Sequence, residues 1–130
     1  MEHNINIGME HTVECIVTKE LSAEAVGSGS LPVYATPYMI ALMEKASEQC
    51  VLSSLAEGFG TVGTEVDIKH IAATPLGMKV TAHAVLKEID KRRLVFDVTV
   101  RDEKEEIGHG SHTRFIVDKA KFMERVSAKI

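Results

Sequence analysis

Hydrophobic and polar positions alternate with a period of two along most of this chain. The clearest run, 61–72, reads TVGTEVDIKHIA, with its charged residues on one side. The other side is formed by Val62, Thr64, Val66, Ile68 and His70. This period is typical of a strand with one buried and one solvated face. Four further runs alternate in the same way: 9–19, 78–87, 94–100 and 107–117.

A long helix is predicted between the strands expected at 9–19 and 61–72. Thr36-Pro37 is a strong start signal, because threonine can cap a helix and proline fits its first position. We expect the helix to end at about Glu57, before Gly58. Its first turns, 38–43, are apolar on all sides, as in a helix that is buried. The pattern predicts one α+β domain, residues 1–130, with an antiparallel sheet around one long helix.

Composition narrows the classes of protein to which the chain can belong. The chain has 130 residues, a formal charge of −4 and 45% hydrophobic residues, which suits one domain with one core. Mild acidity argues against a nucleic-acid binder, and no apolar run is long enough to span a membrane. The N-terminus lacks signal-peptide features, so we expect a cytoplasmic protein. Cys15 and Cys50 fit buried hydrophobic positions rather than a disulfide.

Two titratable residues occupy positions predicted to be apolar. His70 is the only titratable group on the inward face of its strand, and an imidazole there can carry a proton near neutral pH. Glu44 follows six apolar residues of the helix. A buried carboxylate needs a partner, and His70 is the candidate. The structural alternatives are a core histidine bonded to a backbone carbonyl and a glutamate exposed beside Glu48.

Thr36 is the third candidate for chemistry. A cap hydroxyl lies at the positive end of the helix, beside free backbone N–H groups that suit an oxyanion or a polarised carbonyl. A purely structural cap is the alternative reading. Eight residues separate Thr36 from Glu44, about 12 Å along the helix axis. With His70 or a ligand between them, the two side chains can line one groove.

Three further signals are weaker. His109 and His112 resemble a metal pair, but an odd spacing on a strand turns them to opposite faces, so we expect no metal site. Lys91-Arg92-Arg93 fits a solvated hairpin tip and can also contact phosphates. Arg114 is predicted to face away from the core, opposite an inward row that includes Phe115, as a surface contact for an anion.

Several motifs, in this order and spacing, resemble the fluoroacetyl-CoA thioesterase family of hotdog-fold proteins. They are 31–36 (LPVYAT), Met43-Glu44, Gly63-Thr64, 69–75 (KHIAATP) and 107–114 (IGHGSHTR). The similarity spans nearly the whole chain. It implies a hotdog fold in a homodimer, with a tetramer as the alternative, with the active site at the subunit interface and the sheets meeting near the His70 strand.

The resemblance also implies roles for individual residues. Thr36, Glu44 and His70 would be catalytic, Gly63 would line the acyl and water site, and Arg114 would lie near the coenzyme. The substrate would be an acyl-CoA, with coenzyme A as part of the substrate and no metal or redox cofactor. The stretch 27–31, GSGSL, lacks the family's pocket phenylalanines, so the resemblance carries over thioester hydrolysis and not fluoroacetate selectivity.

We therefore predict an acyl-CoA thioesterase that acts on a short or small acyl group. Either Glu44 attacks the thioester or an activated water does, and the residues alone leave both routes open. The alternative from another class is a non-catalytic acyl-CoA-binding hotdog module. A hydratase on this fold would need an inward aspartate, but Asp67 is predicted to lie on the face opposite His70.

Overall fold

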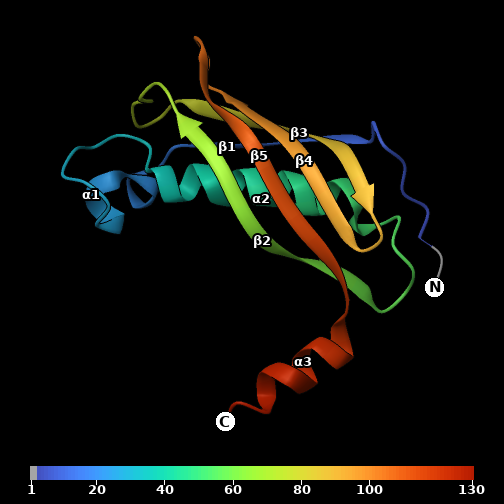
Figure 1. Ribbon diagram of the computed structural model, residues 1–130. Helices are drawn as coiled ribbons and strands as arrows, with labels where there is room; N and C mark the ends of the chain where they lie inside the picture. The colour runs from blue at the N-terminus through green and yellow to red at the C-terminus, as the bar shows by residue number, and fades with distance from the viewer. Residues whose placement is uncertain (1–2) are drawn as a thin grey trace.

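A curved antiparallel sheet wraps around one long helix in the computed structural model, which describes residues 3–130 (Figure 1). The helix is α2 (Thr36–Leu52). The strands are β1 (Glu10–Ile16), β2 (Phe59–His70), β3 (Lys79–Asp90), β4 (Arg93–Arg101) and β5 (Glu106–Asp118). They form one five-stranded sheet in the order β1-β3-β4-β5-β2. The α+β prediction, a sheet around one helix, is confirmed.

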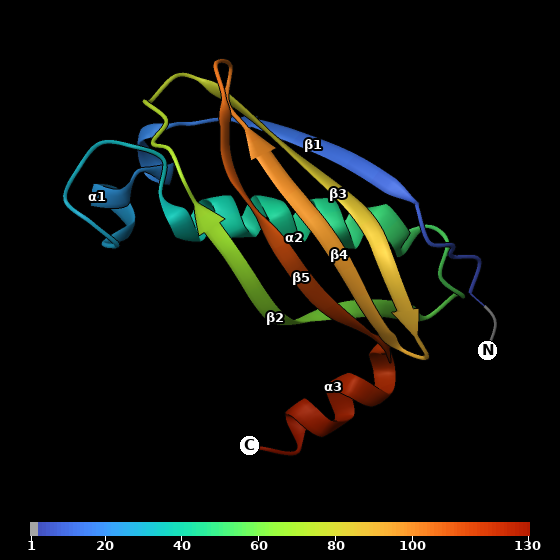
Figure 2. The ribbon, with the colours of Figure 1, turned by 45° about the horizontal axis from the view of Figure 1, so that its top comes forward.

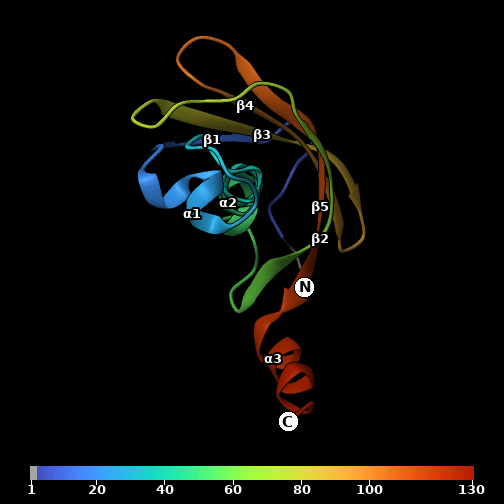
Figure 3. The same ribbon diagram turned by 90° about the vertical axis from the view of Figure 1, so that its left-hand side faces the viewer.

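Three short elements complete the fold: η1 (Lys19–Leu21), α1 (Ala23–Val26) and α3 (Lys119–Ser127). Figure 2 shows α1 beside the first turn of α2, close to the end of β2. Viewed along α2, the sheet curves around the helix while α3 leaves the body of the domain (Figure 3). No helix within residues 3–130 is long and apolar enough to cross a membrane.

The core lies between α2 and the concave face of the sheet. The buried helix residues include Met39, Met43, Ala46 and Cys50, at the spacing of one helix face. Opposite them, β3 contributes Val80, Ala82, Ala84 and Leu86, all fully buried. The two alanines leave room for the helix to approach the sheet. Cys15 and Cys50 are free thiols, as predicted.

The bounds of α2 differ from the prediction at both ends. Ala35 is the N-cap, so Thr36 is the first helical residue and its side chain makes no capping hydrogen bond. The hydroxyl bonds His70 instead. The helix stops at Leu52, because Ser53 and Ser54 begin a turn; serine competes for backbone hydrogen bonds and is a poor helix former.

A bulge in β2 changes which residues face inward, so part of the inward row predicted for this strand is wrong. Gly63 pairs with Arg114 and Glu65 pairs with Thr113, which leaves Thr64 as an extra residue. Each such insertion moves the following residues to the opposite face. Val66, Ile68 and His70 therefore point inward as predicted. Before the bulge, the inward positions are Thr61 and Gly63, so the prediction was wrong for Val62 and Thr64.

A second bulge, in β5, overturns the prediction for Arg114. Val100 pairs with Gly108 but Arg101 pairs with Glu106, so Ile107 is the extra residue on β5. The alternation counted from Ile107 is therefore reversed along the rest of the strand. Arg114 points inward and is only 6% exposed, whereas Phe115 points outward and is 38% exposed.

Candidate active site

The first half of the candidate site joins the start of α2 to the end of β2. Thr36 Oγ1 lies 2.7 Å from His70 Nδ1, a hydrogen bond between a helix residue and a strand residue that are 34 positions apart. Thr36 sits in the first turn of α2, where backbone N–H groups lack partners within the helix. The hydroxyl, the imidazole and the positive end of the helix therefore meet at one point.

His70 combines a partly buried ring with a buried, unused nitrogen. Its Nε2 is buried and has no hydrogen-bond partner among residues 3–130. Burial lowers the pKa of His70 and outweighs the opposing contact with the backbone of Ala72. The ring is therefore neutral near pH 7, with Nε2 available to a ligand. Buried polar atoms without partners are uncommon and often belong to functional sites.

An open pocket of about 320 Å³ adjoins this pair. It is lined by Ala23, Ser28, Val33, Tyr34, Thr36, His70, Ile71, Ala72 and Ala73. The wall contains residues from α1, from the loop before α2 and from the end of β2. A small ligand in this pocket has access to both Thr36 and His70.

Glu44 belongs to a second cluster, deeper along α2. Its Oε2 lies 3.6 Å from Arg114 Nη1 and 4.0 Å from His112 Nε2. The Glu44 side chain is 42% exposed, so the carboxylate bridges solvent and a buried cation. Within residues 3–130 of one protomer, no hydrogen bond or ion pair joins Glu44 to His70, and the predicted pairing is replaced by Arg114.

Arg114 is buried and is held by three hydrogen bonds, whereas the sequence predicted that it lies on the surface. Its Nε donates to Thr61 Oγ1 at 2.7 Å and its Nη2 donates to the Thr61 carbonyl at 2.9 Å. Its Nη1 donates to His112 Nε2 at 3.1 Å. A buried guanidinium is costly unless its donors are satisfied, and here the remaining direction of Nη1 faces Glu44.

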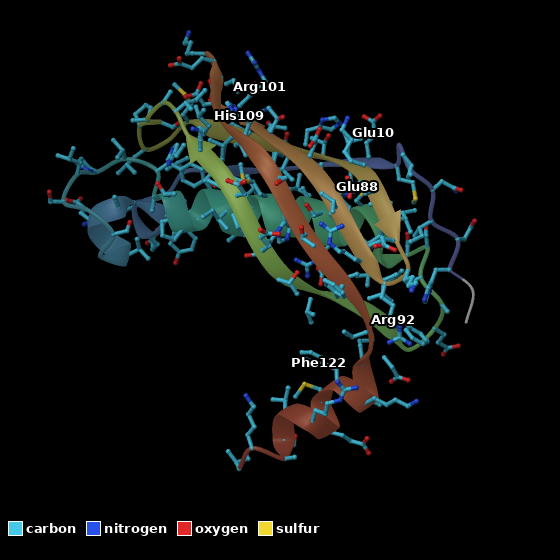
Figure 4. All side chains as sticks on the ribbon, viewed as in Figure 1. Glu10, Glu88, Arg92, Arg101, His109 and Phe122 are labelled. Carbon is cyan, nitrogen blue, oxygen red and sulfur yellow. The ribbon has the colours of Figure 1, made fainter. Side chains whose placement is uncertain are left out.

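His112 completes the second cluster and was not predicted from the sequence. The ring is 1% exposed, and its Nδ1 donates to the Glu65 carbonyl at 2.8 Å. That bond fixes the tautomer, so Nε2 is the acceptor for Arg114. Burial, together with the charge of Arg114, lowers the pKa of His112. The predicted separation of the two β5 histidines is confirmed, because His109 is exposed and contacts Glu106 (Figure 4).

Gly63 faces the same cluster from β2. A methyl group at this position would lie 2.7 Å from Glu44 Oε2, 3.1 Å from His112 Cε1 and 3.2 Å from Arg114 Nη1. Real Cβ atoms essentially never approach another atom as closely as 2.7 Å, and the two longer distances are also tighter than ordinary contacts. The glycine therefore leaves the space in which the Glu44 carboxylate lies.

Both clusters lie where α2 faces β2, with Thr36 and Glu44 about 12 Å apart along the helix axis. The fluoroacetyl-CoA-specific thioesterase family model matches residues 17–120 of this sequence. The chain belongs to this family. The resemblance inferred from its motifs is thereby confirmed.

Named relatives agree with this assignment. The fluoroacetyl-CoA thioesterase of Streptantibioticus cattleyicolor is 33% identical over 99% of this chain and 97% of its own sequence. A solved structure of fluoroacetyl-CoA thioesterase is 32% identical, with a TM-score of 0.90 over 97% of this chain and 98% of that chain. A Thermus thermophilus thioesterase-superfamily protein is 31% identical, with a TM-score of 0.87 over 96% and 95%. The predicted hotdog fold is confirmed.

Proposed function

We propose that this protein hydrolyses short acyl-CoA thioesters to the free acid and coenzyme A, with Thr36, Glu44 and His70 as its catalytic residues. Family membership makes it a thioester hydrolase. The observation that carries the choice of residues is the hydrogen bond between Thr36 and His70, beside an open pocket and a buried, unpartnered Nε2.

In the mechanism that we propose, the thioester carbonyl lies near the start of α2. The Thr36 hydroxyl and neighbouring N–H groups stabilise the negative charge that develops on the carbonyl oxygen. Attack at the carbonyl carbon breaks the C–S bond. The neutral His70 takes up the proton that the hydrolytic water loses, on the thioester or on the anhydride, and the imidazolium then returns a proton to the coenzyme A thiolate. The attacking oxygen belongs either to Glu44, which gives an anhydride that water then cleaves, or to a water activated by Glu44 or His70.

Arg114 and Gly63 have supporting roles in this proposal. Arg114 is fixed by three hydrogen bonds and orients the Glu44 carboxylate toward the substrate. Gly63 leaves room for the acyl group or the attacking water beside Glu44. No metal or redox cofactor takes part, and coenzyme A enters as part of the substrate.

A small acyl group suits the pocket beside Thr36. The loop 27–31 that borders it consists of glycine, serine and leucine, with no aromatic residue to close the pocket selectively. We therefore propose a preference for short acyl groups without selectivity for fluoroacetyl-CoA. Two free cysteines and an acyl-CoA substrate favour a location in the cytoplasm.

A second copy of the chain completes the site in this proposal. β2 is an edge strand of the sheet, and such an edge exposes backbone groups that can pair with another strand. Val66 points to the concave face of that strand and is 40% exposed. We propose a homodimer that pairs the two β2 edges and brings the two sets of catalytic residues to the interface, with a tetramer as a further assembly.

The test of the function is the release of free coenzyme A thiol from acetyl-, fluoroacetyl-, propionyl- and butyryl-CoA. Thiol release that is fastest with the shortest acyl groups supports the proposal. Binding of these thioesters without thiol release would contradict it and would favour an acyl-CoA-binding module.

A further inference from the structure

The turn between β4 and β5 is joined to the loop that follows His70 through one buried hydroxyl. Thr74 Oγ1 donates a hydrogen bond to Asp102 Oδ2 at 2.8 Å. Thr74 is fully buried, although its neighbours Ala73 and Pro75 are exposed. Figure 1 and Figure 2 show this turn at the same end of the sheet as the loop. A buried polar side chain within an exposed loop indicates a specific contact rather than general packing.

The Asp102 carboxylate divides its two oxygens between the turn and the loop. Oδ1 accepts hydrogen bonds from the backbone N–H groups of Lys104 at 2.8 Å and Glu105 at 2.9 Å. Oδ2 accepts from Thr74. Partial burial opposes ionisation, but these hydrogen bonds outweigh it and lower the pKa of Asp102. The carboxylate is therefore charged near neutral pH, and its bond to Thr74 is stronger than one between neutral groups.

Thr74 also holds the segment that leads into α2. Its carbonyl accepts a hydrogen bond from the Tyr34 backbone N–H at 2.9 Å, and Pro75 forms a β-bridge with Val33. Tyr34 lies two residues before Thr36 and lines the same pocket. The position of Thr74 therefore helps to determine where the chain enters the helix and where the Thr36 hydroxyl lies.

The same loop holds the other member of the catalytic pair, His70. The backbone N–H groups of Ile71 and Ala72 donate to the Ile107 carbonyl, at 2.7 Å and 3.4 Å. Ile107 is the bulge residue of β5, immediately after the turn. The backbone of Ala72 in turn contacts the His70 ring. The loop is therefore anchored twice after His70, at the bulge and at Thr74.

We propose that Asp102 is a positioning residue for the catalytic pair, Thr36 and His70, and that it acts through Thr74. The inference rests on the proposed function, because that function assigns the catalysis to this pair. Asp102 fixes Thr74, and Thr74 fixes both the loop after His70 and the segment before Thr36. The 2.7 Å contact between Thr36 Oγ1 and His70 Nδ1 depends on both segments. A displacement of about 1 Å in such a pair can lower a rate about a hundredfold.

Two variants remove the hydrogen bond from opposite ends. Thr74→Val keeps the shape of the side chain without its hydroxyl. Asp102→Asn has one oxygen acceptor where the carboxylate has two, so it cannot serve both the turn and Thr74. With acetyl-CoA, we expect kcat to fall at least about tenfold in each, with a smaller change in KM, because the catalytic pair acts on the transition state. The double variant should lose no more than either single variant, since both remove the same bond.

Two control variants separate the hydrogen bond from general effects on the loop and the turn. Thr74→Ser retains the hydroxyl and should keep a kcat close to that of the wild type. Glu103→Gln removes a charge from the same turn, where Glu103 accepts a hydrogen bond from the Lys79 backbone N–H, and should keep wild-type kinetics. Wild-type kcat in Thr74→Val or Asp102→Asn would overturn the proposal, as would a rise in KM alone or an equal loss in Thr74→Ser.

An NMR titration of the histidine rings tests the positioning without any measurement of activity. Burial lowers the pKa of His70 in the wild type. A loosened loop admits water to the ring, so we expect this pKa to rise toward the ordinary value of about 6.5 in Thr74→Val and in Asp102→Asn. The pKa of His112, which is held in the Arg114 cluster, is the internal control and should not change. A lower midpoint of urea unfolding with an unchanged His70 pKa would show a purely structural bond and would overturn the proposal.

The two measurements also separate this proposal from the proposed function. If the wild type releases no thiol from acyl-CoA thioesters, the proposed function fails, and the His70 titration still tests whether Asp102 positions the ring. A raised pKa in both variants then supports the positioning role, and an unchanged pKa refutes it.

Discussion

Arg114 Nη1 donates a hydrogen bond to His112 Nε2 at 3.1 Å, and the same nitrogen lies 3.6 Å from Glu44 Oε2. Only a neutral His112 can accept that bond, because a protonated ring has donors on both nitrogens. Burial and the nearby charge of Arg114 lower the pKa of His112 and keep the ring neutral, while the Glu65 carbonyl accepts a hydrogen bond from Nδ1–H and so fixes the tautomer. His112 therefore determines where Arg114, and through it Glu44, is held.

His112 does not contact the substrate in the proposed mechanism, but its replacement should still lower the catalytic rate. In His112→Leu, Arg114 loses one of its three hydrogen bonds and Nη1, the nitrogen that faces Glu44, is held less firmly, so we expect kcat for thiol release to fall about tenfold to a hundredfold, with a smaller change in KM. His109→Leu, on the opposite face of β5, is the control and should retain wild-type kinetics. Wild-type kcat in His112→Leu, with folding verified by circular dichroism, would contradict this role.

Gly63→Ala should lower the activity of the protein and leave its stability nearly unchanged. The added methyl group would lie closest to the flexible end of Glu44, which can rotate away at little cost to the fold, while His112 and Arg114 would need to shift by only a few tenths of an ångström. We expect kcat to fall at least about tenfold, since small displacements of reacting groups are costly, while the midpoint of urea unfolding stays close to that of the wild type. A variant that keeps wild-type kcat would show that Glu44 does not need this space.

The free energy of unfolding should decrease as the pH falls below about 6.5. Burial lowers the pKa of His70 and of His112, so below the ordinary histidine pKa of about 6.5 the unfolded chain binds more protons than the folded one. Stability from these neutral rings is present above that pH and is lost as the pH falls. Urea titrations between pH 8 and pH 5, at about one-unit intervals, measure it.

The same titrations on His112→Leu supply the control. This variant lacks one of the two depressed groups, so its stability should change less between pH 7 and pH 5 than that of the wild type, within the about 1.4 kcal/mol per pH unit that one proton allows. An identical or steeper dependence in the variant would show that His112 does not contribute.

The proposed pairing of β2 edges predicts the effect of a charge on that strand. Val66 points inward from the edge strand and is 40% exposed in the single protomer. A lysine there would place two like charges close to the dimer axis, so Val66→Lys should shift the protein from dimer toward monomer in light scattering. Val126→Lys, on α3, should remain dimeric. A wild-type protein that is monomeric at micromolar concentration would contradict the pairing.

Much of the fold follows from simple periodicity. The strands, the start of the long helix near Thr36 and the inward orientation of His70 could be predicted because alternation and proline position are local signals. The two bulges could not. Thr64 and Ile107 insert one residue each into their strands. A glycine adjoins each of them, but a glycine in a strand can equally mark a close approach of another chain segment, so it does not identify a bulge by itself. Each bulge moves every later side chain on its strand to the other face.

Those bulges also limited the prediction of the site. Counting through Ile107 placed Arg114 on the surface, and the position of His112 within the core was missed for the same reason. The signal that was available is a histidine and an arginine two residues apart, which must share a face of a strand. Glu44 was expected to need a buried partner, but the identity of that partner depends on how β5 packs across α2.

The most direct test of the account is the release of coenzyme A thiol from acetyl-CoA by the wild type, by His70→Ala and by His109→Ala as the matched control. The account predicts thiol release by the wild type and by His109→Ala, and a loss of at least about a hundredfold in His70→Ala, the scale of losing an acid–base group. Thiol release that is unchanged in His70→Ala would contradict the proposed active site.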